Sequence, residues 1–262
     1  YYGFEYLVGA SAEMETSKFE YSGSGRAISA TGFVNVLAQF HSRYKSDPDA
    51  RFVGANGLGY FITENGVADA TDVLRPAYIT EHLSALAYAR DVLEIPIRGY
   101  IHWTITDNWE WADGYCPKFG LVAVNRASVD LRRVPRDSYY LYRQIVTSRR
   151  VTAEQSIAAW EAVVAASTSN ATHEICRATD GVSSLDVPTQ VRVLGGSSRA
   201  TDWRFWPSDV RMRDERASSA STLLATSIAF STLTGIYPVA DGTEPTASLS
   251  HSVDRFLDAA LQ

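Results

Sequence analysis

The sequence is poor in cysteine and has no excess of positive charge, and both features narrow its possible functions. Its 262 residues include two cysteines, Cys116 and Cys176, which are too few for a disulfide framework or a cysteine metal cluster. We therefore expect free structural thiols or a reducing compartment, with Cys116 unpaired. The 24 Lys and Arg residues against 30 Asp and Glu residues give a net charge of −6, which argues against general nucleic-acid binding.

Long apolar runs are also scarce. Residues 217–240 carry no charge and are long enough to cross a bilayer, for which about 20 apolar residues suffice. However, nine of them are Ser or Thr, and Gly235 and Pro238 interrupt the end of the run. Because hydroxyl groups weaken the driving force for insertion, we expect a buried or interfacial helix instead of a transmembrane one.

The start of the chain lacks a methionine and a signal or transit segment, which suggests a fragment. Two regions differ in composition along its length. Residues 1–150 are dense in aromatic side chains, whereas residues 151–262 are rich in Ser, Thr and Ala. We place a domain boundary near Arg150, and we expect the second region to be partly helical and partly irregular.

Hydrophobic periodicity in the first region predicts a strand, a helix and a second strand. Residues 33–44 have the period of a separate, earlier helix, and residues 60–63 form a short apolar run typical of a strand. Thr71 and Asp72 are expected to cap the next helix, which has Pro76 in its first turn and ends before Pro96. Five residues of this helix fall on one face, turn by turn: Ile79, Leu83, Leu86, Ala87 and Arg90. Residues 98–105 are the second expected strand. This βαβ unit indicates an α/β fold.

Acidic and aromatic residues follow both expected strands. The first strand ends in YFITENG, which contains Glu64, and the second runs into IHWTITDNWEWADG, with three tryptophans and three acids. A strand ending on Glu is often only a strand meeting water, but β/α barrels present catalytic acids at this end of their strands. Tryptophan faces stack on sugar rings and carboxylates bind sugar hydroxyls, so the second segment favours a carbohydrate site.

These segments carry a resemblance. YFITENG, RGYIHWTITDNWEWADGY and PKFGLVAVN resemble the carboxyl-terminal half of a family 1 glycoside hydrolase, over about residues 1–150. Within that family, ENGVADATDVLRPAYITEHL, VTAEQSIAAW and ATDWRF are similar to the plant and algal galactolipid:galactolipid galactosyltransferases. The resemblance implies part of a (β/α)8 TIM barrel, from the end of strand six to strand eight, with a carboxyl-terminal extension.

The resemblance also implies roles for individual residues. Glu64 matches the nucleophile of a retaining glycosidase, and Tyr2 matches the tyrosine that orients it. Four residues match positions that bind the sugar: Trp103, Glu110, Trp111 and Phe119. A retaining mechanism needs a second carboxyl about 5–5.5 Å from the nucleophile, which this family carries in a TxNEP motif. No NEP tripeptide occurs in the sequence, so we expect the chain as given to be inactive.

Three functions are compatible with these residues. The first is galactosyl transfer between galactolipids, which forms oligogalactolipid and diacylglycerol. The second is hydrolysis of O-glycosides of the β-glucosidase or β-galactosidase type, and the third is a non-catalytic galactolipid-binding remnant. The resemblance implies a location at the chloroplast outer envelope and no cofactor, although it allows a divalent cation such as magnesium.

Other polar residues have more ordinary interpretations. His102 is expected to alternate away from Trp103 and to pack between sheet and helix. Asp107 and Asn108 are expected to orient the loop, and Asp113 has no assigned role. Seven arginines are expected to form a solvated surface, with an approach to anionic lipid headgroups as the alternative: Arg126, Arg132, Arg133, Arg136, Arg143, Arg149 and Arg150.

Overall fold

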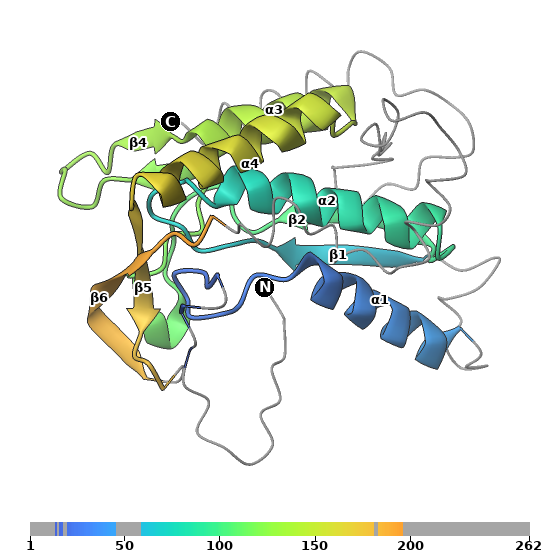
Figure 1. Ribbon diagram of the computed structural model, residues 1–262, viewed down its shortest axis with the longest axis horizontal. Helices are drawn as coiled ribbons and strands as arrows, with labels where there is room; N and C mark the ends of the chain where they lie inside the picture. The colour runs from blue at the N-terminus through green and yellow to red at the C-terminus, as the bar shows by residue number, and fades with distance from the viewer. Residues whose placement is uncertain (1–13, 15, 18–19, 46–58, 181–182, 196–262) are drawn as a thin grey trace.

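The computed structural model describes residues 14, 16–17, 20–45, 59–180 and 183–195. Within these ranges the chain forms eleven elements, which Figure 1 shows in chain order from blue to orange. They are α1 (Ala30–Tyr44), β1 (Tyr60–Asn65), α2 (Arg75–Asp91), β2 (Ile97–His102), η1 (Trp111–Asp113), β3 (Val122–Val124), β4 (Arg133–Pro135), α3 (Asp137–Ser148), α4 (Ala153–Thr168), β5 (Thr172–Arg177) and β6 (Ser184–Arg192).

The expected βαβ unit is present. Strands β1 and β2 pair in parallel, with Ile62 opposite Tyr100 and Asn65 opposite His102, and α2 connects them. Parallel strands need a long crossover, and α2 supplies it by packing against the sheet (Figure 1). The helix expected over residues 33–44 is confirmed as α1. The α/β class is therefore confirmed for this part of the chain.

The cap of α2 differs from the prediction. The carboxylate of Asp69, not Thr71 or Asp72, accepts hydrogen bonds from the backbone N–H groups of Leu74 and Arg75, at 2.7 and 3.1 Å. These N–H groups lie at the start of the helix and have no partner within it. Asp72 instead has a left-handed φ of 61° and accepts hydrogen bonds from Arg75 and from the backbone and hydroxyl of Ser138. It therefore joins the start of α2 to the start of α3.

Helix α2 is the centre of the hydrophobic core. Its predicted ladder residues Ile79, Leu83 and Leu86 are buried, whereas Arg90 is partly exposed and pairs with Asp91. Helix α2 is buried beyond one stripe because it contacts α1, α3 and α4 as well as β2. An amphipathic period of 3.6 residues identifies only a helix with one buried face, so the sequence pattern underestimated the burial of α2.

The segment after residue 150 packs onto the βαβ unit. Thr152 caps α4 through a capping box with Gln155, and Ala159 and Val163 of α4 are buried in one cluster with Leu74 and Ala77 of α2. An antiparallel hairpin of β5 and β6 follows. The prediction of a partly helical and partly irregular region did not include these strands. The domain boundary near Arg150 stays a prediction, but Ala159, Val163 and Val193 share a core with α2.

Two further expectations concern segments outside the described residues. The uncharged run 217–240 and the DWRF segment are not described. Among the residues that are described, none of the helices combines the length and the apolar character that a membrane span requires.

Candidate active site

Glu64 occupies the next-to-last position of β1, at the carboxyl end of the parallel pair. Its neighbour Asn65 is fixed from β2, because the Tyr100 hydroxyl donates to Asn65 Oδ1 at 2.9 Å and the Trp103 N–H donates to the Asn65 carbonyl at 2.9 Å. Gly66 continues this contact, since a Cβ there would lie 1.7 Å from the carbonyl oxygen of Trp103. The ends of β1 and β2 are thus locked together directly beside Glu64.

Trp103 and Glu110 form a direct pair. The Trp103 indole Nε1–H donates to Glu110 Oε1 at 3.1 Å, which fixes the ring and the carboxylate relative to each other. Glu110 is only 5% exposed, and this burial raises the pKa of its carboxyl. The nearby charges of Asp113 and Glu64 raise the pKa further, whereas hydrogen bonds from Trp103 and Asn108 lower it. Of these effects on the pKa of Glu110, burial is the largest and the Glu64 charge the smallest.

The loop that carries Glu110 is a closed turn around η1. The Glu110 N–H donates to the Gly114 carbonyl at 2.7 Å, and the Asp113 N–H donates back to the Glu110 carbonyl at 2.9 Å. The Trp111 side chain projects outward and is 80% exposed, so it does not share the buried position of Glu110. Trp109 is 55% exposed and meets Tyr115 edge to face, with ring centroids 5.0 Å apart.

Asp107 anchors the start of this loop, as the sequence predicted. Its carboxylate forms a two-pronged ion pair with Arg136, with N–O distances of 3.1 and 2.9 Å, and accepts the Gly120 N–H at 2.9 Å. Arg136 is thereby removed from the predicted solvated arginine surface. Arg126 also has a specific contact, since its guanidinium lies 3.6 Å from the centroid of the Tyr115 ring.

The remaining predicted site residues lie elsewhere. Phe119 is buried at 1% exposure, and its carbonyl accepts the Thr104 N–H at 3.3 Å. Tyr2 lies outside the described residues, so its predicted role is untested. The structure thus pairs Trp103 with Glu110 at the strand end next to Glu64, leaves Trp111 exposed, and buries Phe119. The catalytic and binding roles of these residues remain predictions.

The expectation of free cysteines was wrong. Cys116 and Cys176 form a disulfide bond across 60 residues of sequence, with their Cα atoms 5.9 Å apart. Cys116 follows the Glu110 turn, and Cys176 lies in β5 of the later hairpin. Two cysteines are enough for one covalent link between distant segments, and only the folded chain shows that they meet.

His102 is a packed residue, as expected. It is 3% exposed, and its ring lies 5.3 Å from the Tyr142 ring of α3. Burial lowers the pKa of His102 to about 3, and the nearby charge of Arg75 acts in the same direction. The imidazole is therefore neutral near pH 7 and is not placed as a charged catalyst.

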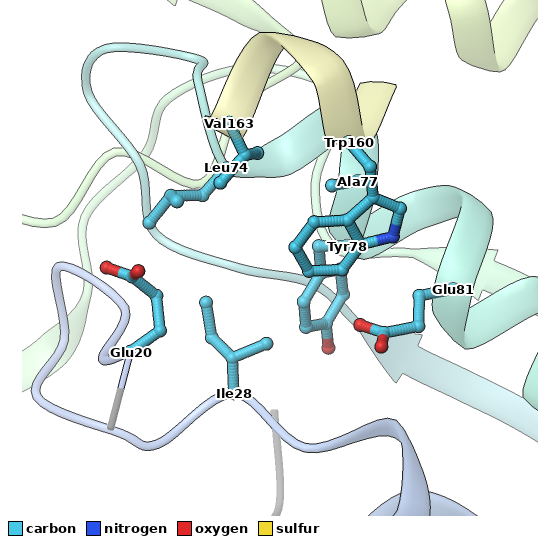
Figure 2. Close-up of a pocket in the computed structure, with 8 residues that line it drawn as sticks. All are labelled: Glu20, Ile28, Leu74, Ala77, Tyr78, Glu81, Trp160 and Val163. Carbon is cyan, nitrogen blue, oxygen red and sulfur yellow. The ribbon is translucent and has the colours of Figure 1, made fainter. Parts of the chain in front are cut away.

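A small pocket lies between α2, α4 and residues 20–28. Figure 2 shows Trp160, Tyr78 and Glu81 on one side of this pocket and Glu20 on the other, with Ile28 between them. Glu20 pairs with His173 at 3.0 Å and accepts the Leu194 N–H at 2.9 Å. Its carboxylate thus holds the segment after residue 150 in place, and we assign no ligand to this pocket.

Comparison with known proteins assigns the chain to a family. Residues 4–151 match the model of glycosyl hydrolase family 1, which is more than half of the chain. The chain belongs to glycosyl hydrolase family 1. The matched residues contain β1, α2, β2 and the Glu110 loop, so the paired strand ends with Glu64 and Glu110 lie within the family region.

Relatives of this family 1 chain include two plant proteins. It is 40% identical over 210 residues to "Beta-glucosidase-like SFR2, chloroplastic" of Oryza sativa subsp. japonica, covering 78% of this chain and 30% of the relative. It is 40% identical over 230 residues to "Galactolipid galactosyltransferase SFR2, chloroplastic" of Arabidopsis thaliana, covering 86% of this chain and 34% of the relative. The chain thus spans about a third of the length of these relatives. A solved β-glycosidase from Thermosphaera aggregans is 33% identical, with a TM-score of 0.44 over 56% of this chain and 27% of that one.

Sequence reasoning missed the residues that hold the site from the extension. Arg177 and Ser184 both bind the carboxylate of Asp113, and Cys176 binds Cys116. No local pattern marks Arg177 or Ser184, since each is an ordinary polar residue of a strand. The pair of cysteines was the one available signal. Among the described residues, the structure shows no group of three or more His, Cys, Asp or Glu side chains arranged to hold a metal ion.

Proposed function

We propose that the complete protein transfers a galactosyl group from one galactolipid to another by a retaining mechanism, with Glu64 as the nucleophile. The observation that carries this proposal is the parallel pairing of β1, which bears Glu64, with β2, whose end joins Asn65 to Trp103 and through Trp103 to Glu110. The name of the Arabidopsis thaliana relative, a galactolipid galactosyltransferase, supports the choice of sugar and reaction. The elements β1, α2, β2 and α3 would be the last two repeats of a (β/α)8 barrel.

The chemistry needs two carboxyl groups. The Glu64 carboxylate attacks the anomeric carbon of the galactose, while an acid protonates the departing oxygen of diacylglycerol. A hydroxyl of a second galactolipid then attacks the glycosyl-enzyme, loses its proton to the same group, and frees Glu64. Glu110 would accept hydrogen bonds from sugar hydroxyls, with the Trp103 ring held against the sugar by its own bond to Glu110.

The acid/base carboxyl is not supplied by an NEP motif within these 262 residues. We therefore propose that residues 1–262 alone bind sugar without turnover. The same glycosyl-enzyme hydrolyses when water replaces the acceptor, so hydrolysis of O-glycosides is the second candidate, as the family description indicates. The experiment must distinguish acceptor use from attack by water.

The test uses the complete gene product and vesicles of monogalactosyl lipid. We expect digalactosyl and longer lipids together with diacylglycerol, and we expect the Glu64→Gln variant to lose at least about a thousandfold in rate, because it lacks the nucleophile. Glu161→Gln is the matched control, since Glu161 is exposed on α4. Free galactose as the sole sugar product would contradict galactosyl transfer and support hydrolysis. Lipid binding without any product would support a non-catalytic remnant.

A membrane contact belongs to the same proposal. Trp109, Tyr115 and Arg126 form an exposed group beside the Glu110 loop, with aromatic rings suited to the lipid interface and a cation suited to anionic headgroups. We expect Arg126→Glu to weaken binding to vesicles that contain anionic lipid and to leave binding to neutral vesicles unchanged. Equal loss on both kinds of vesicle would contradict a role of the Arg126 charge.

The location is likewise proposed. Both plant relatives are named chloroplastic, and we propose a chloroplast location for the complete protein. Within the chloroplast, we propose the outer envelope. Fractionation of chloroplasts with an antibody against the protein tests this. Recovery outside the chloroplast fraction would refute the location without affecting the proposed chemistry.

A further inference from the structure

The β5–β6 hairpin lies directly against the loop that carries Glu110. In Figure 1 the short green turn of η1 sits at the foot of the orange-yellow hairpin, although some 60 residues separate them in sequence. The hairpin follows residue 151, where the family match ends. It is therefore an addition beyond the family region that reaches back to the candidate sugar site.

Three bonds join the hairpin to this loop. The Cys116–Cys176 disulfide fixes the end of the loop. Arg177 Nη2 binds Asp113 Oδ2 at 2.8 Å, and the Ser184 hydroxyl donates to the other oxygen of the same carboxylate. The side chains of Arg177 and Asp113 are only 18% and 11% exposed, so water competes poorly for this ion pair. The carboxylate of Asp113 is thus held entirely from the hairpin side.

Restraint of Asp113 is transmitted to Glu110 through the turn. The Asp113 N–H donates to the Glu110 carbonyl, and the Glu110 N–H donates to the Gly114 carbonyl, so the two residues belong to one closed ring of hydrogen bonds. Asp107 and Arg136 fix the other end of the loop from the family region. The Glu110 loop is therefore held at both ends, and the hairpin provides the second hold.

The hairpin has firm support of its own. The Cys176 N–H donates to the Gly23 carbonyl at 2.7 Å, and the Gly23 N–H donates to the Ala68 carbonyl at 2.6 Å, in the segment that follows Glu64. The side chain of Arg177 crosses Gly25, where a Cβ would lie 2.5 Å from Arg177 Cγ. The hairpin cannot slide on this support without losing these contacts. It is a fixed platform for the loop.

We propose that Arg177 and Cys176 of β5 are positioning residues for sugar binding by Glu110. They hold the loop in its binding geometry before the sugar arrives, and so they reduce the ordering cost of binding. The inference rests on the proposed role of Glu110 in the sugar site. It assigns a purpose to a hairpin outside the family region.

The test compares three variants of the complete gene product: Arg177→Met, Asp113→Asn, and the double variant Cys116→Ser with Cys176→Ser. Arg192→Met is the matched control, because Arg192 lies in the same hairpin but binds Asn170 at the opposite end. We expect each test variant to bind deoxygalactonojirimycin about 3- to 10-fold more weakly, measured by tryptophan fluorescence. KM should rise by a similar factor with a smaller change in kcat, and Arg177→Lys should restore part of the loss.

Hydrogen exchange of the Glu110 and Asp113 amides provides a measurement that does not depend on activity. We expect exchange at both amides to accelerate at least about tenfold in the test variants and to be unchanged in Arg192→Met. Unchanged exchange in all variants would overturn the positioning role, and Asp113→Asn keeps the test available if Arg177→Met does not fold. If the wild type binds no sugar, the proposed function fails, whereas the exchange result still decides whether the hairpin positions the loop.

Discussion

The indole N–H of Trp103 donates to Oε1 of Glu110 across 3.1 Å, so the aromatic face and the acid of the candidate sugar site are fixed as one unit. Trp103 follows β2 directly, and Glu110 lies seven residues later in a loop that turns back over the strand end. The bond satisfies a polar group of a tryptophan that is partly buried. It also holds an acid beside Glu64, in a place where burial and a neighbouring charge oppose its ionisation.

We expect Glu110→Gln to lower kcat/KM of the complete protein about 10- to 100-fold. The amide oxygen can still accept the Trp103 N–H, so the variant removes the charge and keeps the shape. Hydrogen bonds to a charged group are worth about 1.5–3 kcal/mol, which corresponds to this range. Steady-state kinetics on a galactolipid substrate measures the loss, and Glu161→Gln serves as the exposed control. Unchanged kcat/KM would remove Glu110 from the site.

Substitution of Gly66 should separate the two strand ends. A Cβ on this residue would lie 1.7 Å from the Trp103 carbonyl oxygen, which is backbone and cannot rotate away. We expect Gly66→Ala to lower the free energy of unfolding by about 1–3 kcal/mol and to reduce activity more than stability alone explains. Gly32→Ala in α1 is the control, since its Cβ would meet mainly the Ser29 side chain and alanine favours a helix. Equal stability of the two variants would contradict the close approach.

The Asp107–Arg136 pair should carry much of the stability of the loop. Its side chains are 3% and 11% exposed, and Asp107→Asn would leave the guanidinium of Arg136 without its counter-charge. We expect a loss of about 2–4 kcal/mol in urea unfolding, since removal of one partner of a buried pair is costly. Asp91→Asn breaks the exposed pair with Arg90 and should cost at most about 0.5 kcal/mol. Similar losses for both variants would show that burial does not determine the effect.

His102 should make the fold sensitive to mild acid. Its pKa is about 3 in the folded chain against an ordinary value of 6.5, so the unfolded chain binds a proton first as the pH falls. Stability is therefore lost on acidification from about pH 6.5 towards pH 3, at up to about 1.4 kcal/mol per pH unit from this group. We expect His102→Phe, which keeps a ring against Tyr142, to remove this part of the slope.

The measurement is the free energy of unfolding of wild type and His102→Phe at several pH values between 4 and 7. Carboxyl groups contribute to both proteins alike, so the difference between the two curves isolates the histidine. The variant should gain relative stability as the pH is lowered. Parallel curves would show that His102 is not a buried neutral group.

Local sequence patterns determined the βαβ unit and the strand-end acids. The apolar runs and the helical ladder gave β1, α2 and β2 with errors of a few residues, because periodicity reports which face of each element is buried. The acids and tryptophans after the two strands indicated a carbohydrate site, and the resemblance to family 1 glycoside hydrolases singled out Glu64, Trp103 and Glu110 within it. The packed state of His102 followed from the alternation of side chains along a strand, which turns His102 away from Trp103.

Only the tertiary structure decided how the site is held. The Cys116–Cys176 disulfide, the Arg177–Asp113 ion pair and the cap of α2 by Asp69 each join residues whose sequence context is unremarkable. Such bonds depend on distance in space, and a strand residue such as Arg177 has no local signature of a partner 64 positions away. The sequence therefore determined which groups are available for chemistry, and the packing of residues 151–195 against the earlier segments decided what fixes them in place.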